Sequence, residues 1–184
     1  MIDSINTNRA KNSSKPNYKV KSVYWFVFIM VFILGIGYLV FNDVFKIVSH
    51  TKTTIYSVKG NQSYEDLHWG SAEIFYKKGL KIQPENYVLI YNLGNAYYQQ
   101  GRYAEAVDVY ENIISHKNGL KEGFVWNNLG SAYYKLGFVQ KSYTTFKRAL
   151  ILDDSDAVIR QNFLFLAQVM QKIEKSKIKN KNTR

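Results

Sequence analysis

The chain of 184 residues contains no cysteine. This absence excludes disulfide bonds, thiolate catalysis, metal sites with cysteine ligands and an N-terminal lipidated cysteine. The three histidines, His50, His68 and His116, lie far apart in the sequence and form no pair at metal-ligand spacing. The sequence also lacks a Ser/His/Asp or Cys/His set, a paired-carboxylate motif and a glycine-rich phosphate loop. We therefore expect no enzymatic activity, no bound metal and no cofactor.

Charge is absent from one long run, Val23 to Phe41, which has nineteen residues and reads VYWFVFIMVFILGIGYLVF. A helix of this length covers the roughly 30 Å hydrocarbon core of a bilayer. Tyr24, Trp25 and Tyr38 lie near its two ends, where aromatic rings favour the headgroup region. The alternative is a signal peptide, but its apolar core is usually shorter and is followed by a small-x-small cleavage site, which residues 39–43 do not provide. The run predicts an uncleaved transmembrane helix over residues 23–41.

The basic residues around this run are distributed unevenly. Five lysines and arginines against one aspartate precede it within residues 1–22, and three lysines against one aspartate follow within residues 42–59. The single apolar run predicts a single-pass protein of the cell membrane. Because an excess of lysine and arginine marks the cytoplasmic side of a span, this excess predicts its orientation. Its N-terminal basic tail, residues 1–22, would be cytoplasmic and disordered, and everything after residue 42 would be extracytoplasmic.

The net charge of +11 belongs to the ends of the chain. Residues 1–22 carry +4 and residues 172–184 carry +5, whereas residues 85–156 sum to −1. A nucleic-acid-binding domain would concentrate its charge on a folded face, so nucleic acid is not the expected partner. The alternative function is electrostatic binding of anionic lipid, polymer or nucleic acid by the basic tails.

Two stretches of the remaining chain resemble one another. Residues 90–101 read IYNLGNAYYQQG, and residues 126–137 read WNNLGSAYYKLG. The second stretch contains W-x2-L-G-x2-Y without a gap, the opening pattern of a helix–turn–helix repeat of about 34 residues. A further copy of the second helix is found at residues 72–86, which end near Pro84. On these motifs the chain resembles the tetratricopeptide repeat family, with an added N-terminal membrane anchor.

This resemblance implies an all-α solenoid of antiparallel helix hairpins. We expect a juxtamembrane linker or degenerate repeat half at 42–67 and a repeat domain at 68–173. Within that domain the repeats would span about 53–86 (partial), 87–120 and 123–156, followed by a capping helix at 157–173. Two extra residues must lie in the loop 116–121. A basic disordered tail would follow at 174–184.

The repeat motif also predicts which residues form the core between the helices. Small residues allow close helix approach, and large ones four apart lie on one helical face. The predicted repeat core consists of Ala72, Tyr76, Leu93, Gly94, Tyr97, Ala106, Tyr110, Trp126, Leu129, Gly130, Tyr133 and Phe146.

In function the resemblance implies an interaction scaffold. We expect a membrane-anchored adaptor that binds a protein or peptide partner, in the assembly of a protein complex of the bacterial cell envelope; self-association stays open. Relatives that clamp a C-terminal carboxylate need cations where this chain has Tyr91 and Phe124, and an arginine where it has Asn162. The groove is therefore expected to be aromatic and rich in amides, and its predicted residues are Val88, Tyr91, Asn95, Tyr98, Gln99, Phe124, Asn127, Ser131, Tyr134 and Lys135.

Overall fold

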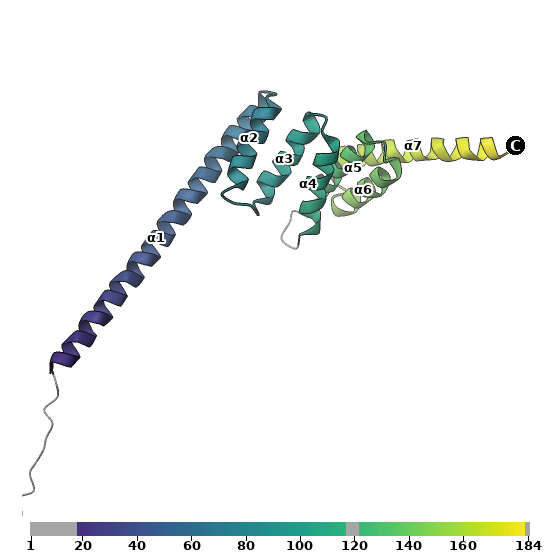
Figure 1. Ribbon diagram of the computed structural model, residues 1–184. Coiled ribbons are helices and arrows are strands. Elements are labelled where there is room, and N and C mark those ends of the chain that lie inside the picture. Colours follow the sequence, from purple (N-terminus) through teal and green to yellow (C-terminus); the bar gives the residue numbers. More distant parts are fainter. Residues whose placement is uncertain (1–17, 117–121, 183–184) are drawn as a thin grey trace, which may run out of the picture. The chain divides into compact units, whose positions relative to one another are not determined.

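The computed structural model describes residues 18–116 and 122–182, and the part of the chain that it describes is entirely helical and loop (Figure 1). The all-α prediction is confirmed. The helices are α1 (Tyr18–Glu65), α2 (Trp69–Leu80), α3 (Tyr87–Gln99), α4 (Tyr103–Ser115), α5 (Gly123–Lys135), α6 (Val139–Leu152) and α7 (Ala157–Asn182).

The chain divides into two compact units, residues 1–46 and 47–184. The described part of the first unit is the beginning of α1, and its apolar side chains between Val23 and Phe41 are exposed. Among the described residues, one helix, α1, is long and apolar enough to cross a membrane, and the candidate span within it begins at Val23. Most of the predicted basic tail, residues 1–17, lies outside the described residues.

The second unit begins with the end of α1, in the region 42–67 where a juxtamembrane linker or a degenerate repeat half was expected. Residues 42–65 are helical throughout, because between residues 42 and 59 neither glycine nor proline interrupts α1. The end of α1 packs on α2 as the first helix of a hairpin: the hydroxyl of Tyr76 donates to Oδ1 of Asn61 at 3.0 Å. Gly60 is buried against the Tyr76 ring, and Thr53 is buried as well. Of the two alternatives expected at 42–67, the linker is wrong for residues 42–65, which are helical, and the end of α1 has the place of the degenerate repeat half.

Three hairpins share the same turn geometry. Gly101 and Gly137 end α3 and α5 with φ of 75° and 80°, in the left-handed region that glycine adopts without a steric penalty. At the corresponding place after α1 the chain has Leu67, with φ of 62°. A leucine in this conformation is strained by roughly 1–2 kcal/mol. The first hairpin therefore follows the repeat geometry despite an unfavourable residue at its turn.

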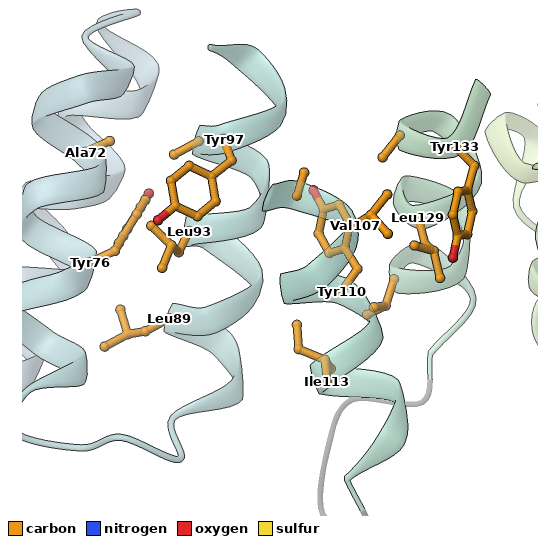
Figure 2. Packing of buried hydrophobic residues seen from close by; sticks show 14 residues of the cluster. Ala72, Tyr76, Leu89, Leu93, Tyr97, Val107, Tyr110, Ile113, Leu129 and Tyr133 are labelled. Carbon is orange, nitrogen blue, oxygen red and sulfur yellow. The ribbon is translucent and has the colours of Figure 1, made fainter. Parts of the chain in front are cut away.

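The core lies between successive helices of the second unit. Figure 2 shows buried side chains of α2, α3, α4 and α5 that project toward neighbouring helices and form one cluster. Of the twelve predicted core residues, eleven are buried. Trp126 is the exception: it is half-buried, and the Arg148 guanidinium lies 5.8 Å from its ring centroid, a cation–π contact at the surface.

Helix α7 closes the described part of the solenoid. Oδ1 of Asp156, in the acidic segment before the helix, accepts hydrogen bonds from the backbone N–H groups of Val158 and Ile159 and so forms its N-cap. The expected disordered tail at 174–184 is wrong for residues 174–182, which continue α7. Lysine and glutamate favour the helix there, and no glycine or proline ends it within residues 174–182. Of the loop predicted at 116–121, residues 117–121 lie outside the described residues, as do 183 and 184.

The close approach of α5 and α6 depends on Gly130. A Cβ atom added there would lie 2.9 Å from Cδ1 of the Phe146 ring, which is closer than packed atoms tolerate. Gly130→Leu should therefore force the two helices apart and lower the free energy of unfolding by about 1–3 kcal/mol. Urea denaturation followed by circular dichroism measures this change. The matched control is Gly70→Leu, because a Cβ atom at Gly70 meets nothing within 4 Å. An unchanged midpoint for Gly130→Leu would contradict the packing described here.

Candidate peptide-binding groove

Two adjoining pockets lie on the side of the solenoid formed by the first helix of each hairpin. One, of about 180 Å³, is lined by Tyr64, Asn95, Tyr98, Gln99, Tyr110, Asn128 and Ser131. The other, of about 200 Å³, is lined by Asn61, Tyr64, Glu65, Tyr76, Asn92 and Asn95. Because Tyr64 and Asn95 line both, the pockets adjoin, and we call their combined surface across α1, α3 and α5 the amide groove.

Asparagines connect the helices beneath this groove. In the first hairpin, Oδ1 of Asn61 accepts from the Tyr76 hydroxyl at 3.0 Å and from Nδ2 of Asn92, on the next hairpin, at 3.1 Å. The second hairpin repeats the arrangement: Oδ1 of Asn95 accepts from the Tyr110 hydroxyl at 2.6 Å and from Nδ2 of Asn128 at 2.9 Å. Each asparagine oxygen therefore joins both helices of its hairpin and the hairpin that follows.

In the third hairpin, other residues replace both the acceptor asparagine and the donor tyrosine. Ser131 stands where the earlier hairpins have asparagine, and Phe146 stands where they have tyrosine. Because phenylalanine has no hydroxyl, it needs no acceptor, and the Ser131 hydroxyl bonds to the backbone oxygen of Asn127 at 3.0 Å instead. In this hairpin Asn127 forms the hydrogen bond to the following helix: its Oδ1 accepts from Nδ2 of Asn162 in α7 at 2.8 Å.

Burial raises the pKa of four tyrosines in and beside the groove. It raises the pKa of Tyr76 to about 12 and places the pKa of Tyr110 far above its ordinary value of 10. Burial also raises the pKa of Tyr91 and of Tyr98. The phenol groups therefore remain neutral hydrogen-bonding groups over the physiological pH range.

Four of the ten predicted groove residues line the amide groove: Asn95, Tyr98, Gln99 and Ser131. Tyr98 is partly buried, and its ring lies edge-on to Tyr103 with the centroids 5.2 Å apart. Ser131 is half-buried and Gln99 is exposed. The structure thus brings together on α3 and α5 the central part of the predicted surface.

The other six predicted residues lie elsewhere. Tyr91 and Phe124 are half-buried against each other, with ring centroids 5.0 Å apart, and the Tyr91 hydroxyl accepts from Asn128 at 2.8 Å. Asn127 is buried in the bond to α7. Val88 and Lys135 are exposed, and Tyr134, 37% exposed, lies edge-on to Phe165 of α7 with the centroids 5.6 Å apart.

Sequence reasoning missed the contribution of α1 to the groove. Asn61 and Tyr64 precede Asn95 and Tyr98 by one repeat of 34 residues, so the spacing carried a signal. The repeat was hard to recognise there because the chain has Lys59-Gly60 where the next repeat has Leu93-Gly94, so the Leu-Gly motif is absent. Lys59 is exposed, and its amine lies 6.0 Å from the ring centroid of Phe75.

The described residues that line the amide groove include no lysine or arginine, and their one carboxylate is Glu65. The groove therefore presents side-chain amides, hydroxyl groups and aromatic edges. Such a surface forms hydrogen bonds with peptide backbone groups and packs against uncharged side chains. It offers no cation that would pair with a carboxylate.

Comparison with known proteins finds a repeat-family match over one hairpin and one curated relative. Residues 88–117 match the family model of the tetratricopeptide repeat. The translocon at the outer membrane of chloroplasts 64, from Pisum sativum, is 32% identical over 99 residues, which are 53% of this chain and only 16% of that relative's length.

Solved structures share the fold at low sequence identity. The first tetratricopeptide domain of Spaghetti (RPAP3), bound to the HSP90 peptide SRMEEVD, is 20% identical with a TM-score of 0.61, covering 66% of this chain and 94% of that one. The corresponding domain of Arabidopsis OM64 is 18% identical with a TM-score of 0.60, covering 65% and 98%. These likenesses show that the helical hairpins have the tetratricopeptide fold.

Exchange of residues between repeats tests the asparagine–tyrosine pair. Asn95→Ser should leave the buried Tyr110 hydroxyl without its acceptor and lower the free energy of unfolding by about 1–3 kcal/mol. Adding Tyr110→Phe reproduces the Ser131–Phe146 pair of the third hairpin and should recover part of that loss. A double-mutant cycle in urea denaturation measures the coupling energy. Strict additivity of the two changes would mean that this bond does not hold the hairpin together.

Proposed function

We propose that this chain, a tetratricopeptide repeat protein, is an adaptor that binds a segment of a protein partner in the amide groove. The observation that carries this proposal is that two adjoining pockets lie across three helices. A groove that crosses several helices accommodates an extended segment along its length. The fold supports this function, since it is that of an interaction scaffold, and the similar domain of RPAP3 is bound to a peptide.

The amide groove retains hydrogen-bonding groups for a ligand. Oδ1 of Asn61 accepts two internal bonds, whereas Nδ2 of the same side chain donates to no other described residue. Gln99 is exposed, and its Nε2 reaches only the Tyr64 hydroxyl, at 3.2 Å. These amides supply donors and acceptors for the backbone of an extended peptide, while Tyr64 and Tyr98 supply aromatic surface.

The charge of the groove distinguishes its expected ligand from an acidic C-terminal peptide. The peptide bound to the RPAP3 domain, SRMEEVD, carries three acidic residues. In this chain Tyr91 and Phe124 stand where the family resemblance places cations, and Glu65 would repel a carboxylate. We therefore propose an uncharged segment of the partner as the ligand.

Membrane attachment is the second part of the proposal. The apolar side chains of residues 23–41 are exposed to solvent in the structure, which supports their burial in lipid. The excess of lysine and arginine before them supports a cytoplasmic N-terminus and an extracytoplasmic repeat domain. In this arrangement the adaptor holds its partner at the membrane, where it would assist assembly of a cell-envelope complex.

The groove assignment is tested by photo-crosslinking in intact membranes. A photoreactive amino acid at Gln99 should capture a protein partner, whereas the same group at Lys147, which is exposed on α6, should not. Tyr98→Ala should then weaken the captured interaction by about 2 kcal/mol, the scale of an aromatic hot spot. Ile151→Ala, which removes an exposed apolar group from α6, serves as the control variant. Equal capture from both sites, or full binding by folded Tyr98→Ala, would contradict the proposal.

Because the chain has no cysteine, single introduced cysteines report its topology. Lys147→Cys should react with a membrane-impermeant maleimide added to intact spheroplasts. Ser13→Cys, in the N-terminal segment, should react only after the membrane is opened. The reverse labelling pattern would overturn the proposed orientation, and labelling of both positions in intact spheroplasts would overturn the membrane span.

A further inference from the structure

Helix α7 occupies the position that the first helix of a hairpin would have, and no second helix follows it among the described residues. Asn162 donates to Asn127 of α5 at 2.8 Å, as Asn128 of α5 donates to Asn95 of α3 at 2.9 Å. Ile159 and Leu166 are buried, and α7 packs on α5 and α6. Among the described residues no further helix packs on α7. The side of α7 that a second helix would cover therefore stays uncovered.

This uncovered face is hollowed and partly apolar. A shallow hollow of about 390 Å³ lies along it, lined by Ala157, Arg160, Gln161, Leu164, Phe165 and Gln168. Leu164 is 54% exposed and Phe165 is 47% exposed. At the helical period, Gln171, Lys172 and Lys175 continue the same stripe. We call residues 157–175 of this stripe the open face.

The open face is not shaped for another repeat helix. Leu164 stands where the preceding first helices have Gly94 and Gly130. Those glycines admit an aromatic ring of the second helix to within about 3 Å of where a Cβ atom would lie. A leucine at this position holds a neighbouring helix away, so the face suits a different type of occupant.

The charge of the open face is of one sign. Arg160, Lys172 and Lys175 lie on it, and the one acidic residue of α7, Glu174, points about 110° away from the centre of the stripe. Arg160 donates to the backbone oxygen of Ser155 at 3.1 Å, and among the described residues it forms no ion pair with a carboxylate. A second copy of α7 would bring cations against cations, because the face has no acid to pair with them.

We propose that the open face of α7 binds an anionic lipid surface. Exposed Leu164 and Phe165 would enter the boundary between headgroups and acyl chains, while the stems of Lys172 and Lys175 extend so that their amines meet lipid phosphates. The site is separate from the amide groove, so it does not depend on the partner proposed above. It places a lipid contact on a folded helix, where composition alone indicates only a basic tail.

The test uses the full chain in nanodiscs of neutral phosphatidylcholine, with an environment-sensitive fluorophore on Gln168→Cys. This cysteine is unique because the natural chain has none. Vesicles of mixed phosphatidylglycerol and phosphatidylcholine, added to the sample, should shift the emission to the blue in a salt-sensitive manner. Vesicles of phosphatidylcholine alone should not.

Two lysines of α7 provide a matched pair of variants. Lys175 lies on the open face and Lys177 lies about 200° around the helix, and both are exposed. In the labelled chain, Lys175→Glu should weaken vesicle binding at least about fivefold, and Lys177→Glu should weaken it less than about twofold. Both variants change the net charge equally, so only the position of the charge differs. Circular dichroism confirms that each remains helical.

Three results would overturn the proposal. The first is no blue shift with anionic vesicles. The second is equal weakening by Lys175→Glu and Lys177→Glu, which would assign binding to the net charge of the tail. The third is a blue shift that grows with nanodisc concentration without added vesicles, which would assign the face to a second copy. Photo-crosslinking at Gln99 is read separately, so failure here leaves the amide groove untouched.

Discussion

The structure depends on one contact repeated along the solenoid, the packing of an aromatic ring of each second helix onto a glycine of the first. Tyr76 meets Gly60, Tyr110 meets Gly94 and Phe146 meets Gly130. A side chain at the glycine would separate the helices and expose the apolar residues between them. Each hairpin buries only part of its apolar surface alone, and neighbouring hairpins complete the core by stacking on it.

The same contact determines what the groove displays. In two of the three hairpins the ring ends in a hydroxyl, and that hydroxyl needs a buried acceptor. An asparagine oxygen on the first helix provides it, which places amides at regular intervals along the amide groove. The amides of the groove are thus present because buried tyrosine hydroxyls need hydrogen-bond acceptors. Where Phe146 removes the hydroxyl, the asparagine is replaced by Ser131 and the groove loses an amide.

The predictable part of the fold follows from residues that repeat at a fixed spacing. Leu93-Gly94 and Leu129-Gly130 mark α3 and α5 because packing requires both members of the pair. The first helix of the first hairpin was predicted only as a degenerate half, because Lys59 replaces leucine at a position that is exposed there. Gly60-Asn61 remained as the signal, since it precedes Gly94-Asn95 by one repeat.

The groove was harder to predict than the core. A core position must be apolar or small in every repeat, whereas a groove residue is defined by side-chain direction and by its neighbours. Tyr91 and Phe124 look like ligand-binding aromatics in the sequence, yet they pack on each other. The length of α7 could not be read from composition either, because the lysine-rich segment that suggests disorder also has a high helix propensity.

The turn at Leu67 has a consequence for how the solenoid comes apart. In a linear array the energy of each repeat is nearly its own, and the terminal repeats have one neighbour instead of two. The first hairpin combines that position with a turn residue in a strained backbone conformation. Local opening should therefore start there, with α1 separating from α2 while the two later hairpins stay closed. Unfolding of the repeat domain then proceeds as a directional process, from the hairpin that contains α1 toward α7.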